Sequence, residues 1–236
     1  MAYTKRISGR KMDETRPISA KAGVIKKADG SGMFKIGGTT AYAAVYGPRE
    51  LFPRNQQDPR QGILRCSYNM LPFAGPGERG RPGPNRRSKE ISMVTTHALR
   101  PVLNLEDYPN AVVDVYIELT ETDAGSRCAG ICAASIALAD AGLMMKDMVA
   151  AIAMGHVGDQ LIVDVDGPEE HIEEVKCTDI PIAMVPSTGE VTLLQMDGPI
   201  KDEQLYNAIE KARPVIERIV QVQRDALKAR FKGDSK

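Results

Sequence analysis

The run Asp123-Ala124-Gly125-Ser126-Arg127 could bind a small anion, because it falls where a predicted strand meets a predicted helix. The start of a helix leaves backbone N–H groups unpaired and carries partial positive charge. Gly125 would let the backbone approach an anion closely, Ser126 could donate its hydroxyl, and Arg127 could bind bidentately. Two charge-assisted bonds of about 1.5–3 kcal/mol each give roughly millimolar affinity, which suits free phosphate as a co-substrate. The alternative is that Ser126 merely caps the helix and Arg127 is solvated.

A second candidate is a loop rich in Gly, Pro and Arg over residues 72–87. Its basic residues and the lysine that follows are Arg79, Arg81, Arg86, Arg87 and Lys89. A flexible cationic loop suits a sugar–phosphate backbone, because it can contact phosphates without reading bases. Arg86 and Arg87 immediately precede a helix that we expect to begin with Ser88 as its cap. Arg65, inside a predicted strand, is a further candidate, and the alternatives are a solvated charge run or an ion pair.

The third feature is an acidic segment between two predicted strands, with the carboxylates Asp164, Asp166, Glu169, Glu170, Glu173, Glu174 and Asp179. Carboxylates brought together can hold Mg²⁺, or one with a raised pKa can protonate a leaving oxygen. Asp179 directly precedes the predicted strand 180–185, so we expect the sheet to fix its direction. For residues 169–174 we expect a solvated loop. The three histidines lie too far apart in sequence to indicate catalysis.

Composition limits the class of protein. The 31 basic and 31 acidic residues cancel, so a polyanion-binding protein would have to concentrate its positive charge locally. The four cysteines show no zinc-ligand spacing, and we expect Cys128 and Cys132 to be buried thiols. The N-terminus is too polar for a signal peptide, and charged residues interrupt every long apolar run. We therefore expect a soluble cytoplasmic protein without a membrane segment.

The elements that would position these residues alternate between strands and helices. Helices are expected from Ser88, over residues 127–142 and over residues 202–231, where Pro214 should kink or divide the last one. The predicted strands cover residues 24–36, 39–46, 63–70, 111–119, 149–156, 160–165, 180–185 and 191–196. This order predicts an α+β (mixed α/β) fold in a single domain over 1–236. Residues 1–146 would carry the anion site, and residues 147–236 the acidic site and the final helix.

Together these motifs resemble the RNase PH family, and more closely its archaeal exosome catalytic branch. The matching stretches follow in order along nearly the whole chain: GR (9–10), DETRPI (13–18), GGTT (37–40), ILR (63–65), MLPF (70–73), RRSKEI (86–91), DAGSR (123–127) and DIPIAM (179–184). The resemblance implies the RNase PH fold, in which mixed β-sheets pack with helices in a ribosomal protein S5 domain 2-like arrangement.

The resemblance also implies an activity, phosphorolysis of RNA. Inorganic phosphate would attack the last phosphodiester at the 3′ end of single-stranded RNA and release a nucleoside diphosphate, with reverse polymerisation possible. The implied phosphate-binding residues are Arg87, Gly125, Ser126 and Arg127. The implied RNA-binding residues are Arg65, Arg81 and Arg86. Asp179 and Glu170 would be the catalytic carboxylates and the ligands of Mg²⁺. The implied partners are a paralogous inactive RNase PH-like subunit, alternating in a hexameric ring, and S1/KH-type RNA-binding cap proteins.

Two positions depart from the family pattern. Relatives usually carry an Asp upstream of the position of Asp179, where residues 166–171 here read DGPEEH, so Glu170 is the best substitute and Glu173 the next. Ser67 stands where relatives can carry a second Arg, so part of the RNA contact would be weaker or supplied elsewhere. Two other functions stay open: a non-catalytic RNA-binding scaffold subunit of the ring, and a stand-alone tRNA-trimming RNase PH.

Overall fold

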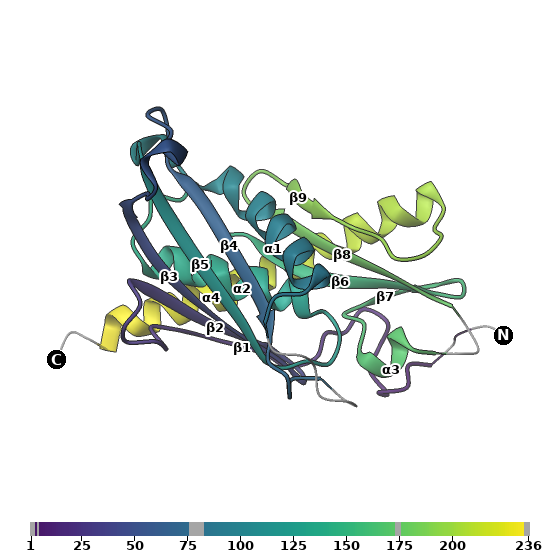
Figure 1. The fold of residues 1–236 in the computed structure, drawn as a ribbon. Helices are drawn as coiled ribbons and strands as arrows, with labels where there is room; N and C mark the ends of the chain where they lie inside the picture. The colour runs from purple at the N-terminus through teal and green to yellow at the C-terminus, as the bar shows by residue number, and fades with distance from the viewer. Residues whose placement is uncertain (1–2, 4, 76–82, 173–175, 234–236) are drawn as a thin grey trace.

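The computed structural model describes residues 3, 5–75, 83–172 and 176–233 of the chain and contains two β-sheets (Figure 1). The five-stranded sheet has the order β1-β2-β3-β5-β4; all its neighbours are antiparallel except β4 and β5, which run parallel. Its strands are β1 (Ile18–Ala22), β2 (Gly30–Ile36), β3 (Thr39–Glu50), β4 (Ile63–Met70) and β5 (Ala111–Glu121).

The four-stranded sheet is antiparallel throughout and has the order β7-β6-β8-β9. Its strands are β6 (Ala150–Val157), β7 (Gln160–Val163), β8 (Cys177–Val185) and β9 (Glu190–Leu194). Three short 3-10 helices, η1 (Arg54–Gln56), η2 (Arg100–Val102) and η3 (Leu105–Asp107), lie in the connections around β4 and β5.

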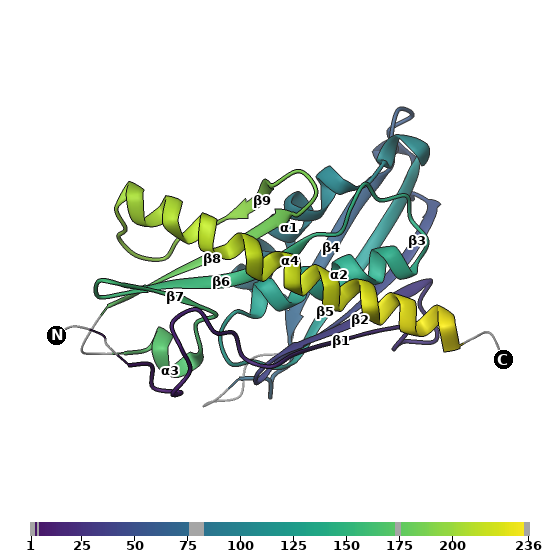
Figure 2. The ribbon, with the colours of Figure 1, turned by 180° about the vertical axis from the view of Figure 1, so that it is seen from behind.

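Helix α2 (Ser126–Asp140) lies between the two sheets and is buried along nearly its whole length. Its small residues allow this close packing: a Cβ on Gly130 would meet a methyl group of Ile117 at 3.2 Å. Figure 2, the view from behind, shows α4 (Asp202–Gly233) lying across both sheets, and one apolar core joins them. Helix α1 (Arg86–Leu99) packs against β4 and β9, and the single turn α3 (Gly167–Glu170) follows β7.

Several predicted boundaries need correction. Strand β4 covers the predicted residues, but residues 24–29 form a turn rather than a strand, because the Ile25 N–H donates to the Ser31 hydroxyl at 2.9 Å. Ser88 is not the cap of α1. Asn85 caps it, since its side chain accepts from the Ser88 N–H at 2.8 Å while the Ser88 hydroxyl accepts from the Asn85 N–H at 2.7 Å.

The last helix is continuous, so of the two effects predicted for Pro214, a kink or a division, the division is wrong. Ala212, Val215 and Ile216 around the proline are buried, and this packing offsets the hydrogen bond that a proline removes. Cys128 and Cys132 are buried free thiols, which confirms that prediction. No helix in the described part of the chain is both long and apolar enough to cross a membrane.

Candidate active site

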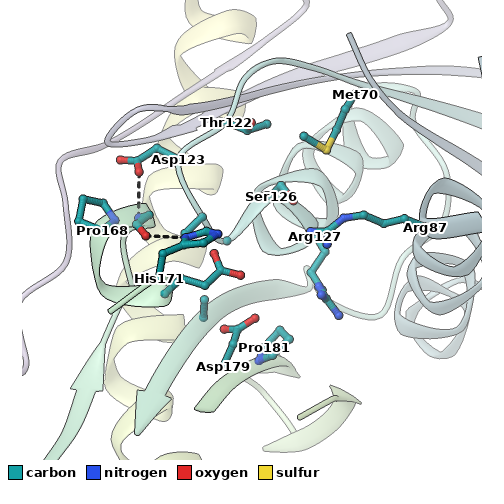
Figure 3. A pocket seen from close by; sticks show the side chains of 15 residues that line it. Met70, Arg87, Thr122, Asp123, Ser126, Arg127, Pro168, His171, Asp179 and Pro181 are labelled. Carbon is teal, nitrogen blue, oxygen red and sulfur yellow. Dashed lines mark hydrogen bonds between the residues drawn. The ribbon is translucent and has the colours of Figure 1, made fainter. Parts of the chain in front are cut away.

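A pocket of about 630 Å³ opens where α1, α2, α3 and the strands β4, β6 and β8 meet (Figure 3). Its lining includes these predicted site residues: Arg87, Gly125, Ser126, Arg127, Glu170 and Asp179. The rest of the lining is Met70, Thr122, Asp123, Ala124, Ala153, Gly167, Pro168, His171 and Pro181. The fold therefore brings the basic junction and the acidic segment, some fifty residues apart in sequence, to one cavity.

The helix end at this pocket has no side-chain cap. Gly125 is the N-cap of α2, and Ser126 is the first helical residue, so the alternative in which Ser126 caps the helix is wrong. Gly125 has φ +64° and Ala124 has φ +55°, so the chain turns sharply through the left-handed region just before the helix. The N–H groups of Ser126 and Arg127 belong to the first turn, which has no intrahelical acceptors. They are thus available to an anion in the pocket.

Contacts from the first sheet hold this turn in place. The Asp123 N–H donates to the Thr39 hydroxyl at 2.8 Å, and that hydroxyl donates to the Ala124 carbonyl at 2.8 Å. Arg16 donates to the Asp123 carbonyl and pairs with its carboxylate at 3.3 Å. The left-handed conformation of Ala124, unusual for a residue other than glycine, is therefore over-determined by its neighbours.

Two arginines add positive charge beside the helix end. Arg127 is half-buried, and its Nη1 donates to Gln195 Oε1 at 2.6 Å, while Gln195 Nε2 donates to Glu90 at 3.1 Å. Arg87 lies in the first turn of α1, and Figure 3 shows its side chain reaching toward Arg127. In a chain without net charge, this is the local concentration of positive charge that a polyanion requires.

Asp179 supplies a carboxylate on the opposite wall of the pocket. It does not precede β8 as expected but lies inside it, because its backbone pairs with Gly155 on β6 and with Asp197 beyond β9. Burial and, next, the charge of Glu170 raise the pKa of Asp179 to about 6, although Arg127 opposes the shift. This aspartate therefore holds a proton at a higher pH than an exposed aspartate would.

The segment expected to be a solvated loop is partly buried instead. Glu169 is fully buried and accepts from Arg6 at 2.7 Å (Nε) and 2.6 Å (Nη2) and from the Tyr3 hydroxyl at 3.0 Å. Asp166 caps α3 in a reciprocal pair of bonds with Glu169. Burial acts to raise the pKa of Glu169, but the hydrogen bonds from Arg6, the Asp166 N–H and Tyr3, together with the charge of Arg6, outweigh it and lower this pKa. The exposed Glu170, next in sequence, is thus carried to the pocket by a firmly held turn.

Other predicted site residues lie elsewhere. Arg65 binds Asp114 through Nε at 2.7 Å and Nη2 at 2.9 Å, as the ion-pair alternative expected, and it shares this carboxylate with Arg49. Its side chain is still 48% exposed. Arg86 is exposed in the first turn of α1. Arg81 and Glu173 lie outside the described residues.

Sequence reasoning missed two residues at this pocket, Asp123 and His171. His171 Nδ1 lies 2.9 Å from the Gly167 carbonyl, which can only accept, so Nδ1 donates and the ring is oriented. Its place directly after Glu170 was the signal available. Asp123 opens the basic motif itself, but the motif does not show what its carboxylate contacts.

The carboxylates at the pocket can be compared with the ligands that Mg²⁺ uses in proteins. The described residues contain no group of three or more His, Cys, Asp or Glu side chains arranged to hold a metal ion. Magnesium commonly binds through one or two carboxylates and completes its shell with waters and substrate phosphates. The two carboxylates Asp179 and Glu170, whose mutual repulsion contributes to the raised pKa of Asp179, fit that mode.

An uncapped, arginine-flanked helix end facing an aspartate with a raised pKa is the kind of site that phosphoryl-transfer enzymes use. Residues 14–144 match domain 1 of the 3′ exoribonuclease family, RNase PH, and residues 147–214 match domain 2, so the chain belongs to this family. The membership confirms the expected activity, phosphate-dependent 3′-to-5′ exoribonuclease.

The similar proteins fall within the same family. The chain is 46% identical over 97% of its length to Exosome complex component Rrp41 of Methanopyrus kandleri, and covers 94% of it. It is 46% identical to the Rrp41 component of Thermococcus kodakarensis and 43% identical to that of Thermoplasma acidophilum, over 96% of this chain and 90% of each relative. The crystal structure of rice Rrp46 has a similar fold, with a TM-score of 0.80 at 24% identity over 93% of this chain and 98% of that one. The predicted RNase PH fold is thereby confirmed.

Proposed function

We propose that this chain is the catalytic subunit of an RNA exosome ring and shortens RNA from its 3′ end by phosphorolysis. One observation carries the proposal: the uncapped N-terminus of α2, with Arg127 and Arg87 beside it, faces Asp179 across a single pocket. A phosphate-dependent enzyme needs both sides of such a pocket, one for the attacking anion and one for the leaving oxygen.

The attacking phosphate binds at the end of α2. The N–H groups of Ser126 and Arg127 and the Ser126 hydroxyl donate to its oxygens, and the guanidinium groups of Arg127 and Arg87 neutralise its charge. No covalent nucleophile is required, since phosphoryl transfer depends mainly on positioning and on charge stabilisation.

The chemical step exchanges one P–O bond for another. An oxygen of the bound phosphate attacks the phosphorus of the last phosphodiester, and the bond from that phosphorus to the 3′-oxygen of the preceding nucleotide breaks. The leaving 3′-oxygen gains a proton, and Asp179 is placed to donate it because burial favours its protonated form. The products are a nucleoside diphosphate and an RNA one nucleotide shorter, and the same residues serve the reverse reaction.

In its deprotonated form Asp179, with Glu170, would hold Mg²⁺, which would neutralise charge on the phosphoryl oxygens when bound. Arg65, Arg86 and Arg81 would contact RNA phosphates outside the phosphate site. For Arg65 this is compatible with the ion pair to Asp114, because Nη1 is not among the atoms that bind the carboxylate and half of the side chain is exposed.

The ring assignment is supported by the relatives, which are named as exosome components, and by the fold shared with rice Rrp46. We propose that the chain alternates with a paralogous inactive RNase PH-like subunit in a hexamer, under S1/KH-type cap proteins and in the cytoplasm. A ring of this kind would admit single-stranded 3′ ends through its channel.

The test is product identity. The chain, with and without its ring partner, is incubated with labelled RNA, phosphate and Mg²⁺, and the products are separated by chromatography. Nucleoside diphosphates are expected, and their release should stop in Asp179→Asn while RNA binding persists. Monophosphates would refute phosphorolysis. Diphosphate release unaffected by Asp179→Asn would make this chain the scaffold, and full activity without the partner would make it a stand-alone enzyme.

A further inference from the structure

The carboxylate of Asp123 connects two parts of the pocket that are far apart in sequence. Its Oδ1 accepts from the Gly167 N–H at 2.9 Å (Figure 3), and its Oδ2 pairs with Arg16 at 3.3 Å. Asp123 itself belongs to the turn that leads into α2, whereas Gly167 is the first residue of α3. One side chain thus bridges the phosphate-binding turn and the turn that carries Glu170.

Arg16, which pairs with the Asp123 carboxylate, is itself held by a buried aspartate. Arg16 is buried, and it donates to Asp164 from its backbone N–H at 2.7 Å, from Nε at 2.9 Å and from Nη2 at 2.7 Å. Asp164 is 1% exposed and stands three residues before Gly167. Arg16 therefore pairs with Asp123, at the phosphate-binding turn, and with Asp164, just before α3. These two carboxylates hold the Arg16 side chain in place.

We propose that Asp123 is a positioning residue for phosphorolysis: its carboxylate sets the place of α3, and so of Glu170, relative to the phosphate held at the end of α2. The proposal rests on the proposed function. Asp123 needs no contact with substrate for this role, since each of its carboxylate oxygens is engaged within the protein.

The geometry of Gly167 makes the bridge testable from its other side. A Cβ at this position would meet Asp123 Oδ1 at 2.6 Å; among the described residues outside the neighbouring backbone, the one further atom within 4 Å would be Asp123 Cγ at 3.9 Å. Gly167 has no positive φ, so alanine adds no backbone strain of its own. Gly167→Ala should therefore push the Asp123 carboxylate away. In the double variant, which has no carboxylate at position 123, the methyl group of Ala at position 167 should meet nothing.

The kinetic test is a double-mutant cycle on the chain assembled with its ring partner. Asp123→Ala and Gly167→Ala should each lower kcat by about 10- to 100-fold, because a misplacement of catalytic groups by about an ångström can cost about 100-fold. The KM for phosphate should change by less than about three-fold, because Thr39 and Arg16 still hold the backbone of the turn. The double variant should be no worse than Asp123→Ala alone. Additive losses, or losses confined to KM, would overturn the proposal.

A second measurement does not depend on activity. Hydrogen exchange of the Gly167 amide should be faster in Asp123→Ala by about ten-fold or more, and unchanged in Asp159→Ala, which alters an exposed aspartate in the β6–β7 turn. If amide exchange at Gly167 is unchanged in Asp123→Ala, the proposed positioning role of Asp123 is refuted even if phosphorolysis is confirmed. Fast exchange in an enzyme that releases no diphosphate would instead locate the failure in the proposed function.

Discussion

Replacing Gly125 by alanine tests the left-handed backbone conformation of the phosphate-binding turn, residues 123–127, without creating a steric clash. The residue has φ +64°, and a Cβ would lie 3.6 Å from the Ala153 Cβ and 3.7 Å from Arg16 Nη2, which are ordinary contacts. The cost is therefore strain, about 1–2 kcal/mol for a left-handed residue other than glycine. The neighbouring Ala124, already at φ +55°, shows that the fold can hold alanine in this region.

Gly125→Ala should thus fold and lose about 1 kcal/mol of stability, which lowers Tm by roughly 2–4 °C in a chain of this size. If the strain tilts one N–H of the first turn away from phosphate, the lost bond of about 1 kcal/mol raises the KM for phosphate roughly five-fold. Differential scanning calorimetry and phosphate-dependent initial rates would measure the two effects separately.

Gly142→Ala is the matched control. Gly142 has φ +74°, nothing within 4 Å of its Cβ position, and a place at the opposite end of α2 from the pocket. It should lose similar stability and keep the wild-type KM for phosphate. The reasoning is refuted if Gly125→Ala costs no stability, or if both variants change the KM equally.

Three further predictions concern single charges. Arg127→Ala should raise the KM for phosphate about 10- to 100-fold in initial-rate assays, because it removes charge-assisted bonds to phosphate from a half-buried side chain; an unchanged KM contradicts its role. Glu169→Gln removes the carboxylate that neutralises the buried Arg6 and should cost about 3–5 kcal/mol in urea denaturation. The folded state lowers the pKa of Glu169, so the contribution of this carboxylate to stability is present above its unfolded pKa near 4.3 and is lost as the pH falls through the lower folded value. The variant should lack this loss of stability at acid pH. Parallel curves of stability against pH for both proteins would count against the ion pair. Arg65→Ala should reduce the salt dependence of RNA binding by about 0.7 in log–log slope, and an unchanged slope would leave Arg65 only its ion pair with Asp114.

The phosphate-binding turn could be predicted from the sequence because all its residues are neighbours in the chain. A glycine, a hydroxyl and an arginine at a strand-to-helix junction need only the helix end to become an anion site, and Ser126 does begin a helix. Likewise, the β-branched residues of 111–119 predict strand β5.

The acidic side was harder to predict, because burial depends on distant segments. Glu169 was expected in a solvated loop, and nothing in its neighbourhood shows that Arg6, 163 residues away, covers it. Strand β1 was missed for a similar reason: Ile18–Ala22 alternates half-buried and exposed residues and is defined by its pairing with β2. Asp123 was visible in the motif, but its bridge to Gly167 exists only in the folded chain.

A crystal structure of the assembled protein with phosphate would test the account most directly. We predict a phosphate within hydrogen-bonding distance of the N–H groups of Ser126 and Arg127, with the Arg87 guanidinium beside it and the Asp179 carboxylate across the pocket. Phosphate bound only elsewhere, or an α2 terminus filled by a protein side chain, would contradict it.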